Sequence, residues 1–120
     1  MVEILAQSSP ECLVARFSGK ITVEEYDVFA DEAKIRLEAG GPVNLVLDVS
    51  DIELSEDLEV AKRDIQFVRG DYKHFRRAAI VGDQKWLAWM TRLLGPFTRT
   101  EEKHFTAGRL EAALAWANNE

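Results

Sequence analysis

The chain has 120 residues, of which 47% are hydrophobic and 30% charged, and its net charge is -6. No apolar run approaches the roughly 18–20 residues that span a bilayer, the N-terminus lacks a signal-peptide pattern, and Cys12 is the only cysteine. These features argue against a membrane-spanning or disulfide-stabilised protein. They predict a single domain over residues 1–120 with a cytoplasmic location.

The charge is divided unevenly between the two halves of the chain. Residues 1–60 hold four lysines and arginines against fourteen acids, whereas residues 61–120 hold eleven against seven. An acidic protein is a poor general nucleic-acid binder, so no nucleic acid is expected as a partner. The basic residues between Lys62 and Arg77 leave two interpretations open: a surface for an anionic ligand or a membrane, or the solvated polar face of a helix.

Two short apolar segments predict a β-hairpin at the start of the chain. Residues 2–7 and 12–18 flank the turn-forming sequence SSPE. In the second segment Leu13, Ala15 and Phe17 share one face, and Cys12 and Val14 share the other.

The next segment predicts a helix that begins at Thr22. Glu25 follows three residues later and completes a capping box with Thr22. Apolar residues then recur at helical spacing at Tyr26, Phe29, Ala30, Ala33 and Leu37. The sequence GGP at residues 40–42 ends the predicted helix.

Two aliphatic segments predict strands at the centre of a sheet. Residues 43–49 form a nearly continuous aliphatic run, typical of a strand covered on both faces, and residues 78–82 form another. Between them Ser55 suits the N-cap of a second helix. We expect the two strands to be adjacent and parallel, joined by a right-handed crossover through that helix.

The last part of the chain predicts two more helices and a strand. Asp83 suits the cap of a third helix, which ends at Gly95 and Pro96, and a short strand at residues 101–105 precedes a closing helix at residues 110–116. The order β-β-α-β-α-β-α-β-α predicts an α/β fold, with a mixed sheet of about five strands and helices packed on it.

Several segments in this order carry a family resemblance. They are GKITVEEY (19–26), LVLD (45–48), RAAIVGDQKW (77–86), EKHF (102–105) and AALAW (112–116). Together they resemble the SpoIIAA-like family, a branch of the STAS-type fold that is related in architecture to CRAL-TRIO lipid-binding domains. The resemblance implies a small mixed sheet with helices on it and a non-enzymatic role in binding or regulation.

One region departs from the STAS pattern. Regulators of the anti-anti-sigma type carry a phosphorylated serine at the start of the helix that follows the Asp-ending strand. Here that position holds Leu58 or its acidic neighbours, and Ser55 is better explained as a helix cap. A phosphate would be repelled by Glu53, Glu56, Asp57 and Glu59. We therefore expect neither Ser50 nor Ser55 to serve as a phosphorylation switch.

The sequence supplies no catalytic constellation. His74 and His104 are the only histidines, and both are expected at the surface. Asp48 and Asp51 could form a carboxylate pair, but no nucleophile or metal partner accompanies them. No Cys/His cluster has metal-ligand spacing, and no glycine-rich loop has a phosphate-binding pattern. The chain is therefore expected to be neither an enzyme nor a metal- or cofactor-binding protein.

The predicted third helix carries more apolar surface than packing on a sheet requires. One interpretation is that this surplus and that of the second helix bury each other. The other is an apolar groove between the two helices, with Leu87 and Leu94 facing the sheet. The predicted ligand-binding residues are Phe67, Trp86, Trp89, Met90, Leu93 and Phe97.

Two functions of different classes remain open. The first is a non-catalytic binding module whose groove takes an apolar or amphipathic small molecule, such as a lipid, with peripheral contact at the inner membrane face. The alternative is a regulatory protein–protein interaction module without a serine switch, which uses the same surface for a protein partner or a homodimer.

Overall fold

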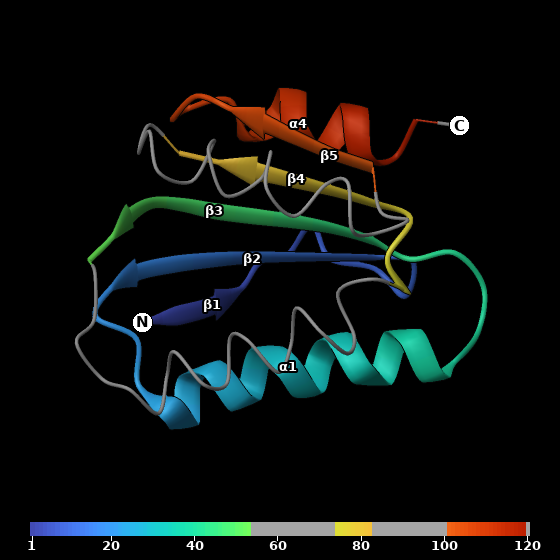
Figure 1. The fold of residues 1–120 in the computed structure, drawn as a ribbon, viewed down its shortest axis with the longest axis horizontal. Helices are drawn as coiled ribbons and strands as arrows, with labels where there is room; N and C mark the ends of the chain where they lie inside the picture. Colours follow the sequence, from blue (N-terminus) through green and yellow to red (C-terminus); the bar gives the residue numbers. More distant parts are fainter. Residues whose placement is uncertain (54–73, 83–100, 120) are drawn as a thin grey trace.

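The computed structural model describes residues 1–53, 74–82 and 101–119. Within them, one five-stranded sheet has the strand order β1-β2-β3-β4-β5, and α1 and α4 pack on it (Figure 1). The strands are β1 (Val2–Ile4), β2 (Cys12–Gly19), β3 (Asn44–Ile52), β4 (Arg77–Val81) and β5 (Glu101–Phe105). The predicted α/β class is confirmed, while the predicted second and third helices, with Ser55 and Asp83, lie outside the described residues.

The strand directions make the sheet mixed. β1 runs antiparallel to β2, with Val2 opposite Phe17 and Ile4 opposite Ala15, so the predicted hairpin is confirmed. The pairs β2–β3, β3–β4 and β4–β5 are all parallel. In the β3–β4 pair Leu45 lies opposite Ala78. The predicted parallel adjacency of these two central strands is therefore confirmed.

Helix α1 (Val23–Glu38) begins and ends where the sequence predicts. The Thr22 hydroxyl accepts the backbone N–H of Glu25 at 3.1 Å, and the Glu25 carboxylate accepts the backbone N–H of Thr22 at 3.3 Å. This capping box satisfies two donors that a helix N-terminus otherwise leaves free. At the other end Gly40 has a φ of 83°, which glycine adopts without the steric cost of a side chain.

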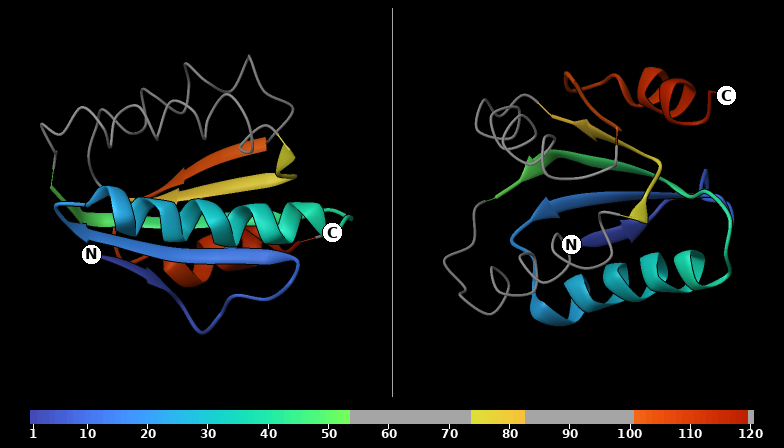
Figure 2. Two further views of the ribbon diagram at one scale, coloured as in Figure 1. Left: turned by 90° about the horizontal axis from the view of Figure 1, so that it is seen from below. Right: turned by 45° about the vertical axis from the view of Figure 1, so that its right-hand side comes forward.

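The two helices cover opposite faces of the sheet (Figure 2). On the α1 side, Phe17 from β2 packs edge-on against Phe29 with ring centroids 5.1 Å apart, and Tyr26 packs against Phe29 at 5.8 Å. Leu13 and Ala15 complete this face of β2 and are fully buried. The predicted apolar stripe of the helix therefore forms the larger core.

The second core lies between the sheet and α4 (Leu110–Ala117). Val14, Val46 and Ala79 from three neighbouring strands meet Ala113 and Ala117, and all five are fully buried. The predicted alternation along β2 is therefore confirmed, because its residues divide between the two cores. None of the helices within the described residues is long and apolar enough to cross a membrane.

Candidate functional site

None of the residues predicted to bind an apolar ligand lies within the described residues. Phe67, Trp86, Trp89, Met90, Leu93 and Phe97 all lie outside the described residues, as do Leu87 and Leu94. The described part of the chain instead shows polar clusters on two strand ends, an open hollow beside α1, and an exposed face of α1.

The first polar cluster lies toward the carboxyl ends of β2 and β3. Arg16 and Asp48 are opposite each other in the parallel register, with Arg16 Nε 3.2 Å from Asp48 Oδ2. Ser50 donates its hydroxyl to Asp48 Oδ1 at 2.7 Å and its backbone N–H to the same oxygen at 3.1 Å. Partial burial acts to raise the pKa of Asp48, but these hydrogen bonds and Arg16 outweigh it and hold the pKa below its ordinary value.

The two carboxylates that the sequence left open as a pair have different surroundings. Asp51 is exposed, whereas the carboxylate of Asp48 is occupied by Arg16 and Ser50. A group with a lowered pKa stays ionised at neutral pH, so Asp48 is a poor proton donor there. Among the described residues no group of three His, Cys, Asp or Glu side chains could hold a metal ion.

The second polar cluster joins the start of β4 to the end of α4. Arg76 donates from Nη2 to the carbonyls of Ala117 and Asn119, each at 2.9 Å. Arg77 donates from Nη1 to the carbonyl of Trp116 at 2.6 Å, and its guanidinium lies 5.1 Å from the Trp116 ring centroid. These cations satisfy carbonyls that a helix C-terminus leaves free and complement its negative end.

Arg76 and Arg77 therefore stabilise the contact between the start of β4 and the end of α4. Arg76 also donates to Asn44 Oδ1 at 3.1 Å, and Arg77 pairs with Glu101 Oε2 at 3.1 Å. The sequence left open a basic surface that includes them, but their guanidinium groups face neighbouring parts of the same chain. The other basic residues of that prediction, from Lys62 to Lys73, lie outside the described residues.

The two histidines differ in their surroundings. His74 is exposed, as predicted. His104 on β5 is half-buried instead, because its ring nitrogen Nε2 contacts the backbone carbonyl of Gly82 beyond the end of β4. The alternating pattern of side chains along a short strand predicts which of them share a face. It does not reveal that a backbone carbonyl of the neighbouring chain segment will contact one of them.

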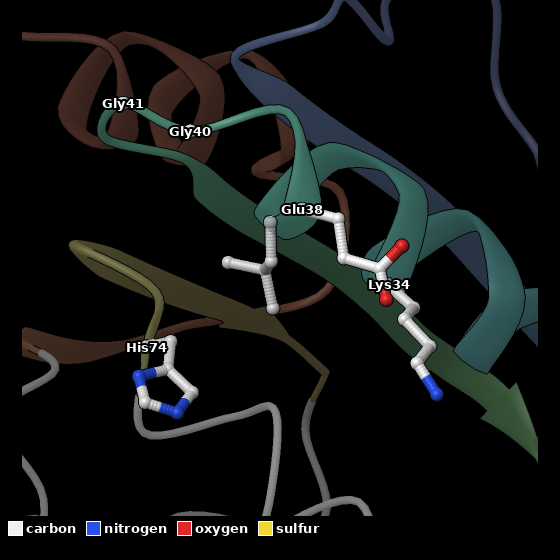
Figure 3. A pocket seen from close by; sticks show the side chains of 6 residues that line it. Lys34, Glu38, Gly40, Gly41 and His74 are labelled. Carbon is white, nitrogen blue, oxygen red and sulfur yellow. The ribbon is translucent and has the colours of Figure 1, made fainter.

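An open hollow of about 420 Å³ lies beside the C-terminal end of α1 (Figure 3). Its lining residues are Lys34, Leu37, Glu38, Gly40, Gly41 and His74. In Figure 3 His74 lies opposite the helix end, with Lys34 and Glu38 on the helix side. A cation, a carboxylate and an imidazole around one apolar side chain suit contacts with a polar group of a partner.

The outer face of α1 adjoins this hollow. Val28 is 54% exposed and Ile35 is 63% exposed, and with Met1 they are the large hydrophobic side chains that are mostly exposed within the described residues. Val28 and Ile35 are seven residues apart, so they lie on the same side of the helix. Sequence reasoning assigned only the buried stripe of this helix, although the spacing of these two residues was a signal for a second apolar line.

Comparisons with known proteins agree with this architecture. A sequence model described as SpoIIAA-like matches residues 12–118. The structure is similar to the crystal structure of an uncharacterized protein with a SpoIIAA-like fold from Shewanella loihica PV-4, with a TM-score of 0.74 and 27% sequence identity. That similarity covers 97% of this chain and 93% of the other. A search of curated proteins finds no match.

Proposed function

The chain belongs to the SpoIIAA-like family, and we propose that it acts as a non-catalytic module that binds a protein partner. The SpoIIAA-like fold suggests a regulatory or interaction module. The observation that carries the proposal is the exposed pair Val28 and Ile35 on a helix whose opposite face is fully engaged in the core. The hollow beside Lys34 and Glu38 extends this surface toward His74.

The polar clusters support a role without catalysis. Asp48 is engaged by Arg16 and Ser50, and the guanidinium groups of Arg76 and Arg77 bind the end of α4. Groups used in this way stabilise a scaffold, and a rigid scaffold presents a binding surface at a low entropic cost.

The proposed module works without a serine switch. Ser50 donates its hydroxyl to the carboxylate of Asp48, and Asp51 is exposed next to it. A phosphate on Ser50 would bring negative charge beside both carboxylates. We therefore expect Ser50 and Ser55 to stay unmodified when the protein is incubated with a serine kinase of the anti-sigma type. Stoichiometric phosphate on either serine would restore the anti-anti-sigma interpretation.

A position-specific crosslinking experiment tests the protein–protein function. A photo-crosslinking amino acid is placed at Ile35 on α1 or, as a control, at the exposed position Glu111 on α4, and the protein is produced in its source organism. We expect a discrete protein adduct from Ile35 and none from Glu111. Absence of an adduct at Ile35, with a small molecule retained on the purified protein, would contradict the proposal.

The apolar composition of residues 84–97 favours a second candidate function. Trp, Met and Phe side chains form adaptable walls for apolar or amphipathic ligands, lipids included. In that case Trp89→Ala weakens ligand binding, whereas Leu87→Ala chiefly destabilises the fold by roughly 2–5 kcal/mol. Native mass spectrometry of gently purified protein separates the candidates, because it reports a bound lipid and a homodimer in one measurement.

A further inference from the structure

We infer that the partner of α1 is a basic amphipathic helix that lies along a line of five exposed residues. This inference rests on the proposed function and specifies the chemistry of the partner. The line, called the acid–aliphatic seam below, consists of Glu24, Val28, Asp31, Ile35 and Glu38.

The seam has the geometry of a helix–helix contact. Its residues are separated by four, three, four and three positions, an average spacing of 3.5 that keeps them in one line along the helix. All five are exposed, whereas Tyr26, Phe29 and Ala33 on the opposite side are buried. The 16 residues of α1 span about 24 Å, which is long enough to present three carboxylates at seven-residue intervals.

Charge and apolar character alternate along the seam. Glu24, Asp31 and Glu38 recur every seven residues, and Val28 and Ile35 lie between them. A matching helix therefore needs a lysine or arginine every seven residues, with aliphatic residues between these cations.

The other charges of α1 leave the seam acidic. Arg36 is held by the carboxylate of Glu32 at 2.6 Å and donates to the carbonyl of Ser9 at 2.9 Å. The carboxylate of Glu25 is 3.3 Å from the N-terminal amine, so it is also engaged within the fold. Lys34 borders the hollow and is the exposed cation of the helix.

Electrostatics decides between this partner and other occupants. If two copies paired through α1 in antiparallel fashion, Glu24 would approach Glu38, and Asp31 would face Asp31 of the other copy. Like charges that face each other across a helix–helix contact are destabilising. An anionic membrane surface is disfavoured for the same reason. A basic helix places an opposite charge against each of the three carboxylates and also covers the two aliphatic side chains.

The test uses two synthetic helical peptides of about 18 residues, long enough for marginal helicity in water. One carries lysine and leucine alternating at four- and three-residue spacing on one face, and the other carries glutamate in place of lysine. Fluorescence anisotropy should give micromolar binding of the lysine peptide and no binding of the glutamate peptide. Small interfaces of this kind are typical of transient complexes.

Three variants locate the binding surface. Val28→Ser with Ile35→Ser, and separately Glu24→Gln with Asp31→Asn and Glu38→Gln, should each weaken binding about tenfold or more. A matched control removes the same number of exposed charges elsewhere, through Glu11→Gln with Asp51→Asn and Glu53→Gln, and should change affinity less than about twofold. Circular dichroism establishes that each variant is folded, which is expected because the substituted side chains are exposed.

Three results would overturn the inference. If the control weakens binding as much as the seam variants, or if the serine variant binds normally, the peptide responds to net charge alone. If sedimentation shows a dimer that the seam variants abolish, the occupant is a second copy. If Ile35 still crosslinks to a protein while the lysine peptide does not bind, the proposed function stands and this inference is wrong.

Discussion

The two faces of the sheet are held by different kinds of interaction. On the α1 face, three aromatic rings, from Phe17, Tyr26 and Phe29, pack edge-on beneath a helix of 16 residues. On the α4 face the helix has eight residues, and small side chains such as Ala113 and Ala117 meet the strands. Arg76, just before β4, and Arg77, its first residue, bind the carbonyl end of that shorter helix.

This difference follows from how much apolar surface each helix can bury. The fully buried side chains of the short helix are alanines, and its Leu110, Leu114 and Trp116 are only partly buried. Such a helix buries less area than one whose buried side chains include aromatic rings, and hydrophobic stabilisation is roughly proportional to area. Polar contacts at the end of α4 should therefore contribute a larger share of the free energy that keeps this helix on the sheet. The α1 face, in contrast, should depend mainly on apolar packing.

The largest expected effect is on the α1 face. Phe29 is 1% exposed and contacts both other rings, so Phe29→Ala should lower the free energy of unfolding by about 3–5 kcal/mol. Urea denaturation measures this loss. Val28→Ala, one position earlier and exposed, serves as the control and should change stability by less than about 0.5 kcal/mol. Similar losses for the two variants would mean that the aromatic cluster is not the main support of α1.

The next effect tests the polar support of α4. Arg77→Ala removes the hydrogen bond to the Trp116 carbonyl and the contact with its ring, and should cost about 2–3 kcal/mol. Arg77→Lys should recover part of this loss, because lysine keeps the charge but not the planar, forked donor geometry. Lys20→Ala, at an exposed position, is the control. Equal stability of the Arg77→Ala and Lys20→Ala variants would show that apolar packing alone positions α4.

A smaller effect, dependent on pH, is expected at Asp48. Asp48→Asn weakens the contacts with Arg16 and Ser50 and should cost about 1–2 kcal/mol at pH 7. Because the pKa of Asp48 is lowered in the folded chain, its carboxylate stabilises the fold above the unfolded pKa of about 3.9, and this contribution is lost as the pH falls through the folded pKa.

Denaturation at several pH values checks this expectation for Asp48. The stability difference between the wild type and Asp48→Asn should shrink below pH about 4, where the unfolded carboxyl becomes protonated. Asp51→Asn, which changes an exposed carboxylate on the same strand, is the control for the loss of one negative charge. A difference that grows as the pH falls would contradict the assigned direction of the shift.

The smallest expected effect is at the start of α1. Thr22→Ala removes the hydroxyl that accepts the Glu25 N–H and should cost about 1 kcal/mol, whereas Thr22→Ser should retain most of the stability. Thermal unfolding of the two Thr22 variants measures this loss of stability, with Thr106→Ala as a control at an exposed position. A loss as large as that of Phe29→Ala would mean that capping, rather than packing, dominates this face.

Local chemistry accounts for the parts of the fold that could be predicted. The Thr22 and Glu25 box, the glycines after α1 and the alternation along β2 depend on neighbouring residues, so they can be recognised along the chain. The parallel pairing of β3 and β4 also follows, because two buried aliphatic strands with a long connection have few other arrangements.

Tertiary contacts decided the roles of the charged residues. Asp48 is opposite Arg16 only because β2 and β3 pair in one particular register, and Arg76 and Arg77 meet the end of α4 although about 40 residues separate them along the chain. A charged side chain near a strand end carries no local sign of its partner, since any cation or carboxylate of the molecule could reach it. The exposure of Val28 and Ile35 also depends on the tertiary structure, because this helix carries two apolar lines and the sheet covers the one that includes Tyr26 and Phe29.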